Sequence, residues 1–341
     1  MALAMLSEVT HGNTRAEIFQ ALGVYSLQEM REKAAAIWNT AYRDDGAVTS
    51  ILASSLWLDE DMDYKSETIQ ALADHYYAST YSGEMGSEEM NAALSGWINE
   101  QTGGLLEGQA ADLELSPETI LALATTVYFR AKWSEEFSPN RTTQGEFDIL
   151  NPDGGTIPCE FMHSSRSDTY YWSDNFSAVS KRLENGGKMW FIRPNHEEGV
   201  SVAALLDDPV TMEFILADGN WENNKFLVVN LSVPKFDVVG EQDLSNALKR
   251  LGITDVFDPV AANFTPVTAT EGVCVSEVDH AARVAIDEEG VTAAAYTVIQ
   301  APGAAMPPEE EVDFVLDKPF LFAITGETGL PLFMGVVQNP A

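Results

Sequence analysis

Three aspartates at alternate positions imitate the start of a calcium-binding loop. Asp59, Asp61 and Asp63 supply the first carboxylates that such a loop would need. The same loop requires glycine at its sixth position and a bidentate glutamate at its twelfth, where this sequence has Tyr64 and Gln70. The spacing therefore argues against a calcium site.

The other residue types that carry chemistry are scattered. The five histidines form no i, i+4 pair suited to zinc: His11, His75, His163, His196 and His280. Cys159 and Cys274 fit neither a CxxC motif nor zinc-ligand spacing, and we interpret them as small buried hydrophobic residues, with a disulfide between them left open. GxSxG, HExxH, GxxxxGK[ST] and GxGxxG motifs are absent. We predict no metal, no cofactor and no enzymatic activity; a hydrolase with paired carboxylates is the open alternative.

Composition limits the class of partner. The 341 residues are 45% hydrophobic, enough for a sizeable core, and contain no run of 18 apolar residues that would span a membrane. With 53 acidic and 19 basic side chains, the net charge of -34 disfavours nucleic acid, anionic membranes and heparin-like cofactors, and favours a cationic partner. Solubility, or life in salty surroundings, is an alternative reason for the charge. Residues 1–6 lack the pattern of a secretion signal.

The elements that must position any site change character along the chain. The pattern of the first part predicts helices at 15–22, 64–79 and 87–101, and strands at 48–58 and 119–133. A capping box formed by Ser26 and Glu29 predicts the start of one more helix. From Glu146 onward short strands dominate, with helices near 207–216 and 242–251. This segregation predicts an α+β fold with large sheets, in a single domain over 1–341.

One segment could change from loop to strand. Val291, Ala293, Ala295, Thr297 and Ile299 would share one apolar and mostly slim face at the period of two that strands impose. The candidate hinge comprises Glu288, Glu289, Gly290, Val291, Thr292, Ala293, Ala294, Ala295, Tyr296 and Thr297, with a solvated, flexible pivot at its first three residues.

This segment resembles the hinge and reactive-centre loop of serpins, a family of protease inhibitors, and Pro319–Phe322 follows 22 residues after Thr297 as it does in that family. The resemblance covers nearly the whole chain. Further segments that are similar to serpins occur in the same order, at 97–104, 125–133, 233–236, 251–253, 280–282, 332–335 and 339–340. A prokaryotic member is expected. The start resembles the middle of the family's second helix, so we expect the first helix and an early strand to be missing.

The resemblance implies a serpin fold: a large mixed sheet, two smaller sheets, helices packed around them and an exposed reactive-centre loop at about 288–311. It places the sheet-opening region at Thr125, Trp133 and His280, with Trp133 beneath the gap where the loop enters. Serpins usually carry asparagine where this chain has Thr125, so the hydrogen bond to His280 would be looser or rebuilt through water. Without the resemblance, we would interpret His280 as a core histidine whose hydrogen bonds are satisfied.

The family's activity implies an irreversible suicide inhibitor of serine proteases. Counting seventeen residues from Glu288 places the reactive bond at Ala304-Ala305, with Ala305-Met306 as the neighbouring register. Small residues there indicate an elastase-like or subtilisin-like target with a shallow apolar pocket. A secreted or cell-surface monomer is expected. The alternative is a non-inhibitory serpin-fold protein, cleaved as a simple substrate or acting as a carrier or chaperone.

Overall fold

The computed structural model describes residues 1–44, 48–111, 113–150, 155–184, 186–276, 278–291 and 310–340. They form two compact units, each assembled from distant segments of the chain. The first unit comprises Met1–Arg43, Ser50–Tyr128 and Gly240–Ala282, and the second comprises Asp44–Thr49, Phe129–Val239 and Arg283–Ala341. The expected single domain over residues 1–341 stays a prediction.

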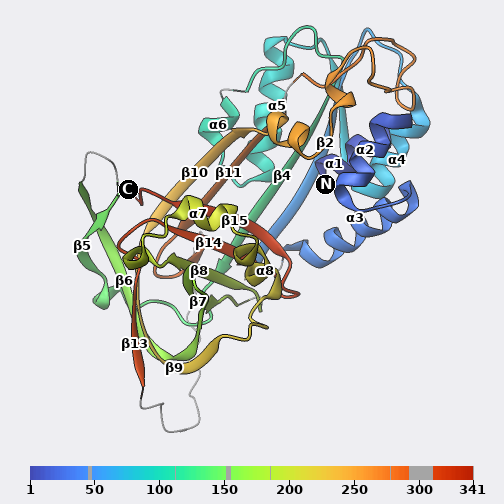
Figure 1. The fold of residues 1–341 in the computed structure, drawn as a ribbon. Coiled ribbons are helices and arrows are strands. Elements are labelled where there is room, and N and C mark those ends of the chain that lie inside the picture. The colour runs from blue at the N-terminus through green and yellow to red at the C-terminus, as the bar shows by residue number, and fades with distance from the viewer. Residues whose placement is uncertain are drawn as a thin grey trace. The chain divides into compact units, whose positions relative to one another are not determined.

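The first unit contains most of the helices (Figure 1). They are α1 (Ala2–Val9), α2 (Gly12–Leu22), α3 (Leu27–Ala41), α4 (Ser66–Tyr76), α5 (Glu88–Gln101), α6 (Glu107–Ala111) and α9 (Ser245–Arg250). The predicted cap of α3 is confirmed, because Ser26 Oγ accepts a hydrogen bond from Glu29 N at 3.1 Å. The helix predicted at 64–79 is too long. Tyr77 adopts a left-handed φ of 56° that ends α4, and strand β3 begins at Ala78.

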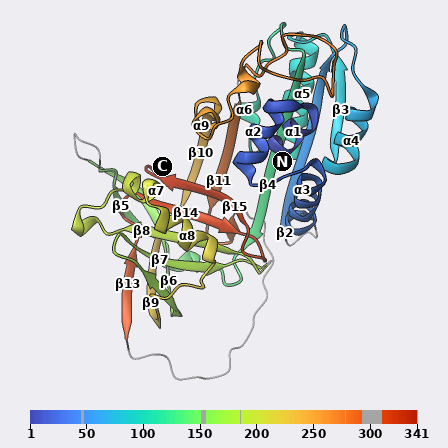
Figure 2. The same cartoon turned by 45° about the vertical axis from the view of Figure 1, so that its right-hand side comes forward.

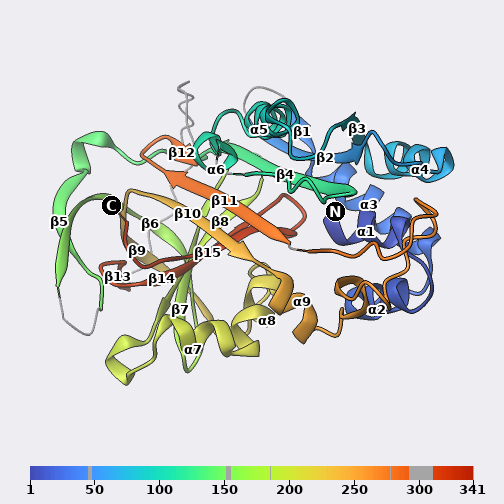
Figure 3. The same cartoon turned by 90° about the horizontal axis from the view of Figure 1, so that it is seen from above.

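One sheet carries the hinge. Its strands follow the order β1-β2-β4-β12-β11-β10, with β3 paired to β2. They are β1 (Arg43–Asp44), β2 (Val48–Asp59), β3 (Ala78–Gly83), β4 (Leu121–Lys132), β10 (Phe236–Asp243), β11 (Asp279–Ile286) and β12 (Gly290–Val291). Figure 3 shows β11 running beside β10. The strands predicted at 48–58 and 119–133 are thus confirmed as β2 and β4.

The second sheet has the order β13-β9-β6-β7-β8-β14-β15, with β5 paired to β6. Its strands are β5 (Thr143–Asp148), β6 (Thr156–Trp172), β7 (Phe176–Arg182), β8 (Lys188–Pro194), β9 (Asn224–Pro234), β13 (Glu311–Val315), β14 (Phe320–Thr325) and β15 (Pro331–Val337). The two smaller sheets expected from the sequence are continuous here, because the 17-residue β6 pairs with β9 along most of its length and with β7 at its end. Figure 2 shows β14 and β15 side by side.

The helices of the strand-rich part differ in detail from the prediction. The helix expected near 207–216 is α8 (Pro209–Ala217), preceded by a separate α7 (Val202–Asp207). Asp208 caps α8 by accepting a hydrogen bond from Val210 N at 3.0 Å, and the proline at the first helical position fits that start. The helix expected at 242–251 begins only at Ser245, because β10 continues to Asp243.

The main core of the second unit reaches the hinge. A cluster of buried side chains from the sheets includes Phe129, Trp133 and Phe137 together with Val291 of β12. Burying Val291 to 2% exposure removes an apolar side chain from water, which favours holding the start of the loop in the sheet.

Candidate functional site at the hinge

The first residues of the candidate loop already lie in the sheet. Gly290 and Val291 pair antiparallel with Lys132 and Ala131 of β4, and Val291 also pairs with Ile286 of β11. Strand β12 therefore lies between β4 and β11. This placement matches the alternation in the sequence, which predicts that Val291 faces inward.

A tight turn connects β11 to β12. One oxygen of the Asp287 side chain, Oδ1, accepts hydrogen bonds from Glu289 N at 2.8 Å and from Gly290 N at 3.0 Å. The backbone N–H of Asp287 donates to the carbonyl of Gly290 at 3.0 Å. Aspartate stabilises such turns because its short side chain can bond to backbone N–H groups that follow it.

Glycine is required at 290 because of close approach. A Cβ atom on this residue would lie 2.4 Å from the carbonyl oxygen of Ala131 and 2.8 Å from Cα of Lys132. Both are backbone atoms of β4, so neither can rotate away. Any other residue would push β12 off β4.

Trp133 and Phe137 hold the backbone of the turn. The backbone N–H of Trp133 donates to the carbonyl of Glu289 at 3.0 Å, and its indole Nε1–H donates to the carbonyl of Asp287 at 2.9 Å. The backbone N–H of Phe137 donates to the carbonyl of Glu288 at 2.8 Å. Both aromatic residues are only 1% exposed. The segment 133–137 thus satisfies three successive carbonyl groups of the turn, those of residues 287–289.

The Glu288 carboxylate has two partners from distant parts of the chain. Its Oε1 accepts a hydrogen bond from Thr142 Oγ1 at 2.7 Å and lies 2.8 Å from Lys235 Nζ. Lys235 Nζ also lies 3.0 Å from Glu160 Oε2. Burial alone would raise the pKa of Glu288, but its hydrogen bonds to Lys235 and Thr142 outweigh burial and lower it.

Burial and hydrogen bonding also have opposite effects on the pKa of Lys235. Burial tends to lower the pKa of Lys235, and the hydrogen bonds to Glu288 and Glu160 overcome that and raise it. Both groups are therefore held in their charged forms near neutral pH. No local pattern in the sequence predicts this contact, because Lys235, Glu160 and Glu288 lie far apart along the chain.

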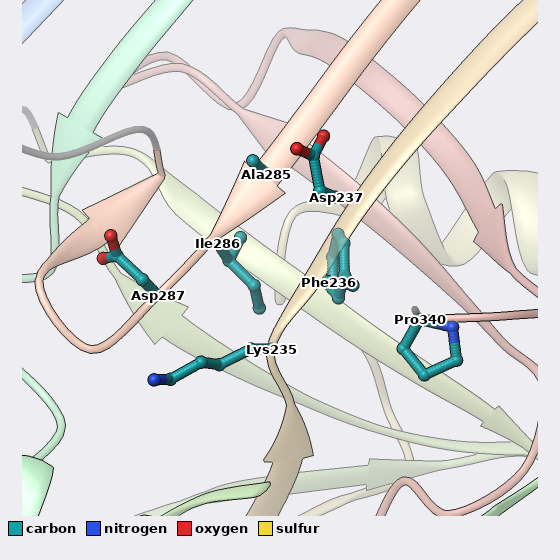
Figure 4. A pocket seen from close by; sticks show the side chains of 7 residues that line it. All are labelled: Lys235, Phe236, Asp237, Ala285, Ile286, Asp287 and Pro340. Carbon is teal, nitrogen blue, oxygen red and sulfur yellow. The ribbon is translucent and has the colours of Figure 1, made fainter. Parts of the chain in front are cut away.

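A shallow hollow of about 300 Å³ opens beside the turn. It is lined by Lys235, Phe236, Asp237, Ala285, Ile286, Asp287 and Pro340. Figure 4 shows Lys235 and Asp287 on one side of the hollow and Pro340 on the other. Asp237 is bound to Arg283 at 2.6 Å, so this carboxylate is already paired.

The structure describes only some of the remaining predicted site residues. Thr125 lies in β4 and is half-buried, and His280 lies in β11 with its side chain outside the described atoms, so their hydrogen bond stays a prediction. The hinge residues 292–297 and the reactive bond at Ala304 and Ala305 lie outside the described residues. In the described ranges no cluster of His, Cys, Asp or Glu could hold a metal ion, and no helix is long and apolar enough to cross a membrane.

Comparison with known proteins identifies relatives along the whole chain. The family model described as serpin (serine protease inhibitor) matches residues 1–340. Serpin-ZX of Arabidopsis thaliana is 29% identical, with 100% of this chain and 90% of the relative covered. The leukocyte elastase inhibitor of Sus scrofa is 27% identical, with 99% and 90% covered.

Solved serpin structures also match nearly the whole chain. The thermophilic serpin Tengpin in its native state superposes with a TM-score of 0.86 at 25% identity, covering 99% of this chain and 86% of that chain. Arabidopsis AtSerpin1 in a native stressed conformation gives 0.81 at 26% identity, covering 99% and 88%. The expectation of a prokaryotic member with a truncated start finds no support in these matches.

Proposed function

The chain belongs to the serpin family and has the serpin fold, and from that premise we propose that it inhibits serine proteases irreversibly rather than acting as an enzyme. The protease would cut within the loop that follows Val291 and form an acyl-enzyme with the new carboxyl end. It would remain attached while the loop enters the sheet. The same proposal places the protein outside the cell or at its surface, as a monomer.

The position of β12 carries this proposal. Residues 290–291 are paired with β4 on one side and β11 on the other, which is the position that an inserting strand would extend. Each further ladder hydrogen bond would contribute about 0.5 to 1.5 kcal/mol net, and each buried Val or Ile side chain about 1.5 to 3 kcal/mol. The residues that follow Val291 are mostly small and uncharged, so they fit that extension.

The proposed target has a small apolar primary pocket. Ala304 would precede the cut bond, and an elastase-like or subtilisin-like protease accepts alanine there, whereas a trypsin-like protease requires Lys or Arg. Two relatives carry the name leukocyte elastase inhibitor, which is consistent with such a target. The net charge of -34 would attract a cationic protease.

The direct test is to incubate the protein with an elastase-like serine protease. We expect a covalent complex that survives hot detergent, and mass spectrometry should place the cut after Ala304. Val291→Arg should convert the inhibitor into a simple substrate, because a charge at a 2% exposed position opposes burial. Val239→Arg is the matched control, since Val239 is 45% exposed on β10 and should tolerate the charge.

A clipped chain beside fully active protease would overturn the inhibitory proposal. It would instead favour a serpin-fold protein that is cleaved without trapping, or that acts as a carrier or chaperone. Cleavage after Ala305 would keep the inhibitory mechanism and move the register by one residue.

A further inference from the structure

A lysine occupies a core position next to the hinge. Val179 in β7 and Leu183, directly after the end of β7, flank Lys181 at a period of two, and both belong to the main core of the second unit. Lys181 is itself only 2% exposed. The period of two would predict an apolar residue there, so the ammonium group needs an explanation.

Two aromatic rings cover this ammonium. Lys181 Nζ lies 4.1 Å from the ring centroid of Phe137 and 5.5 Å from that of Trp133. Within the described part of the chain, no carboxylate forms an ion pair with it. These rings belong to the same two residues that bind the carbonyl groups of Asp287, Glu288 and Glu289.

Burial dominates the electrostatics at this position. It lowers the pKa of Lys181 from 10.5 to about 7, helped by the positive charge of Arg166 and opposed by Glu135 and Asp168. Both carboxylates are themselves paired with Arg166. Across from Lys181 on β8 stands Met189, which is apolar and fully buried. Cation–π contacts are weaker than the cost of burying an ammonium, so the neutral form is favoured above about pH 7 while the rings stay in place.

We propose that Lys181 is a proton-controlled restraint on the hinge, whose protonation favours release of the turn at 287–289 from Trp133 and Phe137. This inference deepens the proposed function, because release of the turn would precede loop insertion. When the turn leaves, the Trp133 indole loses its bond to the Asp287 carbonyl, and the backbones of Trp133 and Phe137 lose their bonds to the turn. The two residues are then less firmly held, and water can reach the side-chain nitrogen of Lys181. A hydrated lysine amine binds a proton more strongly than a buried one, so linkage makes opening easier as the pH falls.

The pH dependence follows from the different proton affinities of Lys181 in the open and closed states. Between the normal lysine pKa and about pH 7, the open state holds a proton that the closed state lacks, so opening becomes more favourable as the pH falls through this range. Below about pH 7 both states are protonated, and the dependence levels off. The largest possible slope is about tenfold in the opening equilibrium per pH unit.

The test measures amide hydrogen exchange of residues 287–291, Trp133 and Phe137 in the uncut protein from about pH 6 to about pH 9, corrected for the intrinsic rates. The equilibrium constant for opening should fall at least about fivefold as the pH rises from about 7 to about 9. Lys181→Met should remove this pH dependence, and its equilibrium constant for opening should stay at the level that the wild type approaches at high pH. Lys188→Met is the control: Lys188 lies on the neighbouring β8 and pairs with Asp218 at 2.8 Å, and its loss should leave the dependence intact.

A flat profile in the wild type, or an unchanged slope in Lys181→Met, would overturn the restraint. If Lys181→Met does not fold, a carbon-13 titration of the wild-type lysines decides the question, because a midpoint near pH 7 supports the restraint and its absence contradicts it. The exchange experiment uses no protease. Failure of trapping with intact pH-dependent exchange would therefore reject the proposed function alone, and the reverse result would reject the restraint alone.

Discussion

Lys235 Nζ lies 2.8 Å from the Glu288 carboxylate, and this contact joins the end of β9 to the turn that precedes β12. The side chains are 30% and 14% exposed, so water screens the pair less than an ordinary surface pair. Because Lys235 also binds Glu160, a single ammonium connects three segments of the second unit. The hinge is thus held by side chains as well as by the sheet.

Lys235→Met should lower the free energy of unfolding by about 1 to 3 kcal/mol, because it leaves the Glu288 carboxylate without its charged partner and with neutral donors such as Thr142. Urea unfolding at neutral pH measures this loss. Lys225→Met is the matched control. Lys225 pairs with Glu310 at 2.6 Å, but these side chains are 50% and 68% exposed, and the change should cost no more than about 0.5 kcal/mol. Equal losses in the two variants would contradict the special role of Lys235.

Trp133→Phe should destabilise the protein by about 1 to 3 kcal/mol. It keeps an aromatic ring but removes the indole N–H that binds the Asp287 carbonyl at 2.9 Å, and it leaves a void at a residue that is 1% exposed. Hydrogen exchange of the turn at 287–290 should quicken as well. Trp221→Phe provides the comparison, because its indole bond to Trp172 O at 3.0 Å is exposed to water that can replace it.

The parts of the hinge that follow from local rules could be predicted from the sequence. Alternation predicts an inward Val291, and its 2% exposure agrees with that. The capping box at Ser26 has the same local character. The contact between Glu288 and Lys235 depends on how distant segments approach, so no spacing in the sequence predicts it.

Two further features show where local rules stop. Tyr77 ends α4 in a left-handed conformation that usually favours glycine, which a pattern of helix formers does not reveal. Lys181 did leave a signal, since it stands between Val179 and Leu183 in the alternation of a buried strand. Only the structure shows that Phe137 and Trp133 cover it.

Gly290→Ala should displace β12 from β4. The added methyl group would lie 2.4 Å from the Ala131 carbonyl oxygen, which belongs to the backbone and cannot move without breaking the ladder. We expect a loss of about 1 to 3 kcal/mol in the free energy of unfolding, together with faster exchange of the Trp133 amide. Gly240→Ala, in β10, should be nearly neutral, because within the described residues no atom beyond its chain neighbours lies within 4 Å of the added methyl group. A neutral Gly290→Ala would show that β12 is not held in this position.

The charge on Glu288 makes part of the stability dependent on pH. Its pKa is lowered in the folded protein from the usual 4.5, so its contribution is complete above about pH 4.5 and is lost as the pH falls through the lower, folded value. The pKa of Lys235 is raised above 10.5, so its contribution is complete below that value and is lost at higher pH. The contact should therefore stabilise the hinge across the whole range between these limits.

Glu288→Gln isolates the carboxylate, because glutamine keeps an oxygen that can accept the Thr142 hydroxyl. The variant should be less stable than the wild type by about 1 to 2 kcal/mol at pH ~7, and this difference should shrink by pH ~3, as the pH falls below the usual 4.5 toward the lowered pKa of folded Glu288. Urea unfolding at both pH values gives the comparison. Glu310→Gln, which removes an exposed partner of Lys225, should change stability little at either pH. If the difference at Glu288 stayed constant with pH, shape rather than charge would account for the contact.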